Sequence, residues 1–395
     1  MPTTRSPRNR SWPPRAKPWR PDNDEPREPE TVTQASPSLD RARPEAKGAG
    51  FDIGRVLLEG RAYFALIAIV VVFSALSPYY LSVSNFLTMS SHVALFGILA
   101  IGMLLVILNG GIDLSVGSTL GLSGVVAGAL MQGVSIGALG VVAYPPVWVV
   151  AVLCCLLGAA IGLVNGVLVA RFKVPAFVAT LGVMYMVRGV ALLMTNGLTY
   201  NNLGGQPALG NTGFDWLGFN RIAGVPIGIL VLVVIAVVGS LLLTRTPFGR
   251  WLYASGGNER AAELSGVPVK PVQVAVYMMS GVCAAVAGLI LSSQLTSAGP
   301  TAGTTYELTA IAAVVIGGAA LTGGRGNVRG TLLGAFVIGF LSDGLVIIGI
   351  SSYWQTVFTG AVIVLAVLLN AVQYRGRAKR PAAAGGRTPS PRPAA

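Results

Sequence analysis

Long apolar segments recur along the chain, and short polar segments separate them. Each apolar segment is near the length of about 20 residues that a helix needs to cross a bilayer. Lipid offers no hydrogen-bond partners to the backbone, so each segment is expected to be helical. The pattern predicts an all-α fold, a polytopic membrane helical bundle of about ten transmembrane helices. The segments lie at approximately 62–81, 92–108, 114–134, 146–170, 175–194, 222–243, 271–293, 304–321, 329–350 and 352–371. The third is rich in Gly and Ser and is the candidate for a break or bend.

The two ends of the chain differ from the middle in composition. The whole chain is 53% hydrophobic and 11% charged, whereas soluble domains are about 25% charged. Residues 1–55 are rich in Pro, Arg, Ser and Glu, and residues 374–395 are basic with no acid. Neither segment can bury enough apolar surface to offset the entropy of ordering. We predict disordered cytoplasmic tails at 1–55 and 374–395 that flank a transmembrane domain at 56–373.

Basic residues mark one side of the predicted topology. With ten spans, nearly all Lys and Arg of the flanks and loops fall on one side, and loops 82–91, 135–145 and 294–303 on the other side carry none. Basic loops face the cytoplasm, so both termini are predicted to be cytoplasmic, in the inner membrane. The same distribution accounts for the net charge of +13, so no nucleic-acid partner is expected. The basic residues are Arg55, Arg61, Arg171, Lys173, Arg245, Arg250, Arg260, Lys270, Arg325, Arg329, Arg375, Arg377, Lys379 and Arg380.

The chain contains few residues of the types that form catalytic or metal-binding sites. His92 is the only histidine, and the three cysteines lie inside apolar segments without a CxxC spacing. The sequence GGRG at 323–326 resembles a phosphate-binding loop, but no Lys directly follows a Gly in this chain, so the pattern GxxxxGK[ST] is absent. No catalytic residue, metal site or cofactor is predicted, and ATP binding by that route is excluded.

Two acidic residues are candidates for a translocation pathway. Asp113 stands between two apolar segments in the stretch NGGIDLSVGS at 109–118, and an ionisable group at such depth is costly and points to function. Asp113 is also placed before Ser115 in the manner of a helix N-cap. Both readings stay open: a structural cap, or a pathway residue together with Ser115. Glu307 opens a later apolar segment, where an acid suits a helix N-terminus, and is the third candidate.

The largest basic loop, 244–271, contains the pattern of a short helix. Asn258 suits the N-cap and Glu259 the first turn. Strong helix formers follow at 261–264, and Gly266 is placed to end the helix in the left-handed conformation. A mere connector does not need a capped helix, so we predict that this helix lies at the cytoplasmic face and docks another protein. The candidate residues are Gly257, Asn258, Glu259, Ala261, Ala262, Ser265 and Gly266, with both alanines on the docking face.

Five stretches, taken in this order, resemble the permease family of ribose-type ABC sugar importers, within the wider branched-chain amino acid and sugar permease group. The resemblance implies a transmembrane permease subunit that moves a monosaccharide or a related small polyol and is not itself an enzyme. One departure is Ala320, which stands where a hydroxyl residue is common in the family, so the resemblance does not single out ribose. The stretches are 109–118, 165–191, 249–269, 306–334 and 351–369.

The resemblance also implies partners and residue roles. The helix near 257–266 would be the coupling helix that docks onto a separate ABC ATPase subunit, and Asp113 with its neighbours would line or support the pathway. The usual assembly adds an extracytoplasmic solute-binding protein and a second permease, either another copy in a homodimer or a homologous permease, all within membrane lipid.

The alternative reading is an ion-coupled secondary transporter of a small solute. It requires paired ionisable groups in facing spans. Asp343 and Arg188 are candidates for such a pair, but no clear relay emerges from the sequence.

Overall fold

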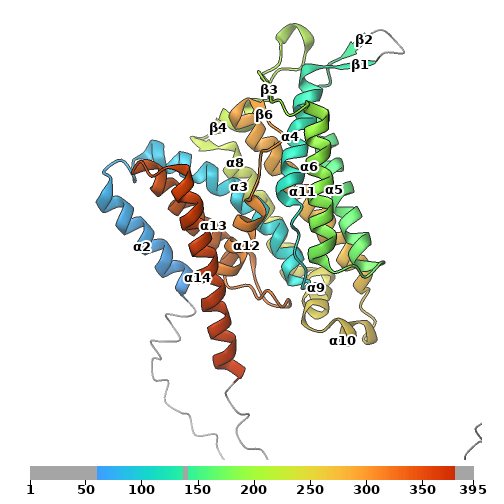
Figure 1. Ribbon diagram of the computed structural model, residues 1–395, viewed down its shortest axis with the longest axis vertical. Coiled ribbons are helices and arrows are strands. Elements are labelled where there is room, and N and C mark those ends of the chain that lie inside the picture. The colour runs from blue at the N-terminus through green and yellow to red at the C-terminus, as the bar shows by residue number, and fades with distance from the viewer. Residues whose placement is uncertain (1–59, 137–140, 379–395) are drawn as a thin grey trace, which may run out of the picture. The chain divides into compact units, whose positions relative to one another are not determined.

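The structure, a computed structural model, describes residues 60–136 and 141–378 (Figure 1). The predicted N-terminal tail at 1–55 lies outside the described residues, as does the predicted C-terminal tail beyond residue 378. The apolar helices follow the ten predicted segments one by one. They are α2 (Arg61–Leu76), α3 (Val83–Leu108), α4 (Val116–Gln132), α5 (Val147–Ala170), α6 (Ala176–Thr195), α8 (Ile227–Arg245), α11 (Val269–Leu295), α12 (Tyr306–Ile316), α13 (Val328–Ile347) and α14 (Ser352–Ala378).

The predicted all-α membrane bundle is confirmed, whereas the number of crossings stays a prediction. Among the described residues, 6 helices are long and apolar enough to cross a membrane by length and composition: α3, α5, α6, α8, α11 and α13. The apolar stretches of α2, α4, α12 and α14 are shorter. At the end of the chain, α14 continues through Ala378, past residue 374, where the predicted tail begins.

The first turns of α3 were predicted to be an outer loop, and that prediction is wrong. α3 begins at Val83, and the Ser82 side chain caps it by accepting the Asn85 N–H at 3.3 Å. The polar residues that suggested a loop are accommodated inside the helix. The Ser90 hydroxyl donates to the Phe86 carbonyl at 2.7 Å, in the same way as its neighbours bond to carbonyls one turn back.

Helical structure is interrupted at two connections between apolar helices, 109–115 and 317–327, which we call the interrupted segments. Residues 109–115 are not helical, so α4 begins only at Val116. The third predicted span is a continuous helix from Val116 to Gln132, so the break or bend considered for it is not present. α12 ends at Ile316, and a non-helical segment at 317–327 precedes α13, with positive φ angles at glycines that include Gly323 and Gly324. The predicted span 304–321 is therefore helical for only 11 residues. Gly318, Gly323, Gly324 and Gly326 turn the chain within this segment.

The helix α3 contacts α8, α11, α12 and α13, and nearly every side chain of its second half is buried. Beside it, α5 packs along α11 through glycines. A Cβ on Gly158 would collide with the carbonyl oxygen of Gly281, and one on Gly162 would collide with that of Tyr277. Small residues permit this close approach, which matters in lipid because burial of apolar surface does not drive helices together there.

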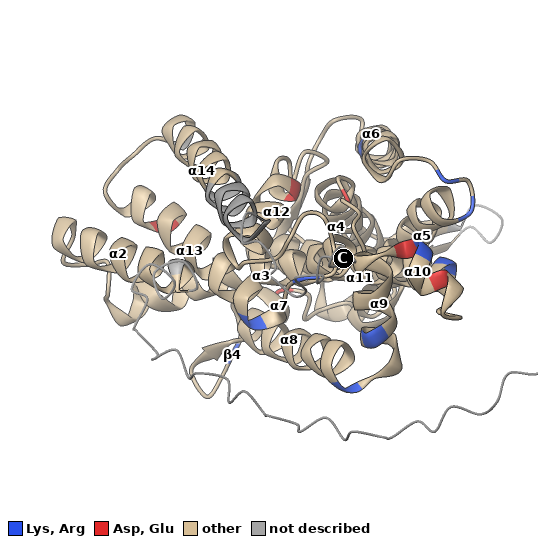
Figure 2. Ribbon diagram, turned by 90° about the horizontal axis from the view of Figure 1, so that it is seen from below, with Lys and Arg blue, Asp and Glu red and all other residues tan. Residues whose placement is uncertain are grey.

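Short elements lie at the two ends of the bundle (Figure 1). At one end, three antiparallel pairs join short strands: β1 (Val134–Ile136) with β2 (Val141–Ala143), β3 (Tyr200–Asn201) with β6 (Ser297–Ala298), and β4 (Arg221–Ile222) with β5 (Val225–Pro226). The helices η1 (Pro207–Leu209) and α7 (Trp216–Phe219) lie in the same long connection as β3 and β4. At the other end are α9 (Pro247–Gly257) and α10 (Glu259–Leu264), near most of the basic residues (Figure 2).

The glycine contact between α5 and α11 makes a prediction about stability. Gly162→Val should lower the thermal stability of the purified protein in detergent, because overpacking costs about 1–3 kcal/mol. Gly182→Val on α6 is the matched control, since a Cβ there meets no atom within 4 Å. Equal melting temperatures for the two variants would contradict the packing described here.

Candidate functional site

Asp113 lies in the interrupted segment between α3 and α4 and is buried, with 1% of its surface exposed. Its Oδ1 accepts the Ser115 N–H at 3.0 Å and the Ser115 hydroxyl at 2.7 Å. Its Oδ2 accepts the Ser280 hydroxyl from α11 at 2.9 Å. On α5, the Asn165 amide donates to Ser115 Oγ at 2.8 Å and lies 3.5 Å from Asp113 Oδ1. One carboxylate thus joins three helices.

This arrangement shows what the Asp113 carboxylate can do chemically. All the groups that contact it are donors, so it is satisfied as an acceptor. The N-cap of α4 is Ser115 and no side chain caps the helix, so the prediction that Asp113 is the N-cap is wrong. The carboxylate instead holds the N-cap residue, through the Ser115 N–H and hydroxyl. The side chain is enclosed and does not face open space. The same region holds a buried Tyr277 hydroxyl that has no hydrogen-bond partner among the described residues. The geometry favours a role in holding the helix start over direct contact with a solute.

Glu307 occupies a different position from Asp113 and Ser115. It lies in the first turn of α12, and its carboxylate contacts the Gly117 position of α4. Arg188 on α6 is close enough to attract it electrostatically, and the guanidinium lies against Gly121, one turn along α4 from Gly117. No hydrogen bond joins Glu307 to Asp113 or Ser115 in the described part of the chain.

Arg188 was noted in the sequence only as a possible relay group, and its role here is different. Its Nη1 donates to the carbonyls of Pro300 and Ala302, the latter at 2.8 Å. The guanidinium therefore fastens the connection between α11 and α12 to α6. The Glu307 carboxylate and the Arg188 guanidinium thus lie against glycines one turn apart on α4, without an ion pair between them among the described residues.

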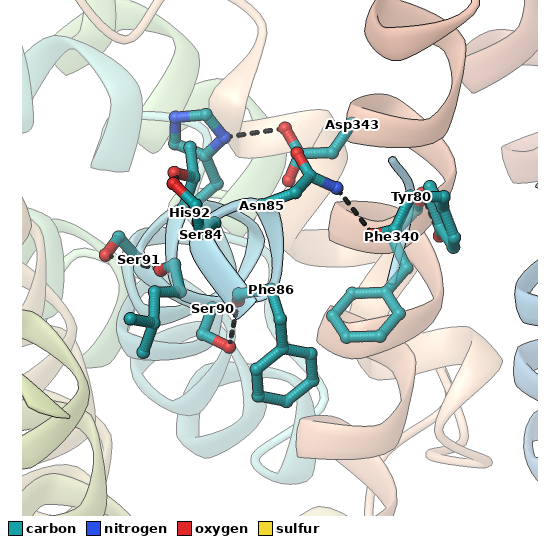
Figure 3. Close-up of polar contacts among 11 residues, drawn as sticks. Tyr80, Ser84, Asn85, Phe86, Ser90, Ser91, His92, Phe340 and Asp343 are labelled. Carbon is teal, nitrogen blue, oxygen red and sulfur yellow. Dashed lines mark hydrogen bonds and ion pairs between the residues drawn. The ribbon is translucent and has the colours of Figure 1, made fainter. Parts of the chain in front are cut away.

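A second polar group lies where α3 begins (Figure 3). His92 on α3 faces Asp343 on α13, with Nδ1 2.7 Å from the carboxylate Oδ1. The Asn85 amide donates to the Tyr80 carbonyl at 2.7 Å, and the Tyr80 hydroxyl donates to the Phe340 carbonyl at 3.0 Å. These contacts tie the start of α3 to α13.

The sequence analysis named His92 and Asp343 but did not pair them. A signal was present, since the one histidine and one acid both lie in apolar segments, but spacing along the chain cannot reveal a contact across 251 positions. No further ionisable side chain of the described residues is hydrogen-bonded or ion-paired to either of them. The pair therefore does not extend into a chain of ionisable groups of the kind that a proton relay needs.

The predicted short helix in the basic loop is confirmed. α10 spans Glu259–Leu264, and the Asn258 side chain caps it by accepting the Ala261 N–H at 3.0 Å. Gly266 adopts a left-handed φ of 81°. The bonds from Gly266 N–H to the Glu263 carbonyl and from Val267 N–H to the Ala262 carbonyl, both 3.0 Å, close the C-terminus as a Schellman motif.

The two alanines of α10 do not share a face, and that part of the prediction is wrong. Ala261 is exposed, but Ala262 is only 5% exposed, because it lies on the side of α10 that packs against α9 and α11. Leu264, which the sequence analysis treated only as a helix former, is 77% exposed. The outward surface of α10 therefore carries Ala261 and Leu264, with Glu259, Ser265 and Gly266 also exposed.

The exposed end of the bundle carries a further contact. The Lys173 ammonium in the turn between α5 and α6 lies 2.8 Å from the Glu259 carboxylate at the start of α10. Both side chains are about half exposed, and such pairs contribute little to stability. The pair instead helps to orient α10.

A bundle of apolar helices, 6 of which are long enough to cross a membrane, is the fold of a multi-pass membrane protein. The chain belongs to the family described as branched-chain amino acid transport system / permease component, whose model matches residues 83–367.

Curated relatives agree over most of the chain. This chain is 43% identical over 315 residues to the ribose import permease protein RbsC of Escherichia coli. The aligned region covers 80% of this chain and 94% of that protein. The ribose import permease protein RbsC of Bacillus subtilis is 42% identical over 78% of this chain and 91% of its own length. The xylose transport system permease protein XylH of Escherichia coli is 34% identical over 79% of this chain and 91% of its own length. No solved structure matches the chain.

The hydrogen bonds of Asp113 predict a graded response to substitution. Asp113→Ala leaves the donors of Ser115 and Ser280 without an acceptor, and each unpaired buried group costs about 1–3 kcal/mol. Asp113→Asn can keep its carbonyl oxygen toward the Ser115 N–H as an acceptor. Its amide nitrogen then faces Ser280, whose hydroxyl can rotate to accept instead of donate. Asp113→Asn should insert normally and reduce solute uptake, and Asp113→Ala should reduce both uptake and thermal stability further.

The measurement is uptake in cells, normalised to the amount of protein in the membrane, together with melting of the purified variants. Wild-type uptake and melting by Asp113→Ala would contradict a structural role for the carboxylate.

Proposed function

We propose that this chain is the membrane-spanning permease subunit of an ATP-driven importer that moves a monosaccharide or a related small polyol across the cytoplasmic membrane. The observation that carries the proposal is the 43% identity to a protein named as a ribose import permease, over 94% of that protein. The family description names branched-chain amino acids, but the relatives compared above are named for ribose and xylose. We therefore assign a sugar or polyol as the solute.

The ATPase is a separate subunit in this proposal, and α10 is its docking element. The outward surface of α10 combines a small residue, Ala261, with a large apolar one, Leu264, which is 77% exposed. An exposed Leu beside a small residue on a rigid, capped helix suits insertion into a groove of a partner. Gly257 and Asn258 set the start of this helix, and Ser265 and Gly266 set its end.

The pathway is proposed to run beside α4. Asp113 and Ser115 support it from within by fixing the start of α4, and they do not contact the solute. Glu307, which lies against Gly117 of α4, is the charged group proposed to face the pathway. A charged side chain that faces lipid is costly, and a hydrated pathway between this chain and a second permease removes that cost.

The remaining partners follow from the importer class. We propose a second permease, either another copy or a homologue, and an extracytoplasmic solute-binding protein that delivers the solute. The binding protein would face the end of the bundle that carries the strand pairs, opposite α10. Membrane lipid covers the apolar surfaces.

Both termini are proposed to face the cytoplasm. This orientation rests on the basic residues at the end that carries α9 and α10 (Figure 2) and on the rule that basic loops stay inside. A reporter that is active only in the cytoplasm should be active when fused at residue 50 or after residue 380. The same reporter in the connection between α6 and α8 should be inactive. Activity at that third position, or labelling of either terminus from outside, would contradict the orientation.

The docking role of α10 predicts a separation of folding from partner binding. Ala261→Arg adds a long charged side chain to an exposed position, so the permease should fold and insert normally, but the ATPase subunit should no longer co-purify and uptake should be lost. Overpacking and an unpaired charge at a contact each cost about 1–3 kcal/mol or more. Ala261→Ser is the matched control and should retain both properties.

Ala262→Arg should behave differently from Ala261→Arg. Ala262 is buried inside the chain, so this substitution should reduce the amount of folded permease as well as uptake. Full co-purification of the ATPase with Ala261→Arg would contradict the docking proposal.

A further inference from the structure

The helix α9 lies between α10, the proposed docking helix, and the two interrupted segments, 109–115 and 317–327. α9 ends and α10 begins at the same residue, because Asn258 follows the last residue of α9 and its side chain caps α10. The Thr246 side chain caps the other end of α9 by accepting the Gly249 N–H at 3.3 Å. The two helices are therefore joined without a flexible linker, and a displacement of α10 must be passed to α9.

Side chains of α9 bond to both interrupted segments. The Tyr253 hydroxyl donates to the Gly326 carbonyl at 2.8 Å, within the segment 317–327. The Ser255 hydroxyl donates to Asn109 Oδ1 at 3.1 Å, within the segment 109–115. Each of these interrupted segments therefore receives a directional bond from the same cytoplasmic helix.

The backbone of α9 is in direct contact with the same two segments. A Cβ on Gly256 would collide with the Leu108 carbonyl oxygen and lie 2.8 Å from the Gly324 nitrogen. That nitrogen itself donates to the Leu108 carbonyl, at the end of α3, at 2.9 Å. A Cβ on Gly323 would in turn lie 2.6 Å from the Gly256 carbonyl oxygen and 3.0 Å from the Gly110 nitrogen. Gly256 therefore lies where α9 meets the end of α3 and segment 317–327, next to Gly110 of segment 109–115, and a side chain there would push them apart.

We propose that Tyr253, Ser255 and Gly256 are positioning residues that transmit the displacement of α10 to the segments 109–115 and 317–327. The first segment carries the Asp113 network that fixes the start of α4. The second connects α12, which carries Glu307 in its first turn, to α13. When α9 moves, its bonds from Tyr253 and Ser255 therefore move both segments together. This inference rests on the proposed function, because it requires an ATPase that moves α10.

The test compares transport with ATP hydrolysis in the assembled importer. The permease variant, its ATPase subunit and its solute-binding protein are reconstituted in proteoliposomes, and solute uptake and ATP hydrolysis are measured in the same sample. Tyr253→Phe keeps the aromatic ring and removes the bond to Gly326, and Ser255→Ala removes the bond to Asn109. The double variant should assemble with the ATPase normally, but the solute transported per ATP hydrolysed should fall at least about fivefold, as expected for the loss of about 1 kcal/mol or more of linkage.

The matched control is Tyr200→Phe, which also removes a tyrosine hydroxyl bond to a carbonyl, here that of Met194 at 3.0 Å, but at the opposite end of the bundle. It should leave the ratio of transport to hydrolysis unchanged. Gly256→Ala should produce the largest loss of this ratio.

Two results would overturn the inference. One is a wild-type ratio of transport to hydrolysis in the double variant. The other is a parallel fall of assembly, hydrolysis and uptake, which would mark a purely structural role for α9. A wild-type permease that shows no ATP-dependent uptake would instead contradict the proposed function, so the two failures are distinguishable.

Discussion

Buried backbone N–H and C=O groups must find hydrogen-bond partners within the protein, and the two interrupted segments, 109–115 and 317–327, depend on that constraint. A continuous helix satisfies these groups within itself, whereas the two segments rely on turns and on neighbouring helices. The Leu108 carbonyl is satisfied by the Gly324 N–H, and the Ile112 carbonyl accepts the Thr180 hydroxyl from α6 at 3.2 Å. The Ala320 N–H bonds to the Arg325 carbonyl at 2.9 Å within its own segment. The hydrogen bonds of these segments therefore hold α3, α6 and segment 317–327 in fixed positions relative to one another.

The interrupted segments let the chain change direction between helices of the bundle. Segment 109–115 is held by Asp113 and its partners on α5 and α11, and by a bond from Ser255 of α9. Glycines permit this packing, because Gly256 and Gly324 bring backbone against backbone. A transport subunit needs both properties, a rigid support around a pathway and a defined connection to the subunit that supplies energy.

The sequence was informative where local chemistry decides the structure. The apolar segments, the cap at Asn258 and the turn at Gly266 follow from residue type and spacing, and the structure has them where they were expected. Polarity misled at Ser90 and its neighbours, because serine in a membrane helix can bond to the preceding turn as easily as it can suit a loop. Length misled at α12, where an apolar segment long enough to span contains glycines that turn the chain instead.

Contacts between distant segments could not be predicted in this way. The pairing of His92 with Asp343, the anchoring of the α11–α12 connection by Arg188 and the burial of Ala262 all depend on how helices pack. Ala261 and Ala262 are equivalent as helix formers, and only the position of α9 beside α10 makes one inward and the other outward. Asp113 was singled out by its charge between apolar segments, but the donors that hold it come from α5 and α11, which the sequence does not place beside it.

The central claim is that ATP hydrolysis by a separate subunit drives solute movement through this chain. The most direct measurement is uptake of radiolabelled pentose into proteoliposomes that contain the permease, its ATPase and its solute-binding protein, with ATP inside or outside and with the proton gradient set independently. The account predicts uptake that requires ATP on the side of α10 and that persists when the proton gradient is abolished. Uptake that follows the proton gradient in the absence of ATP would contradict it.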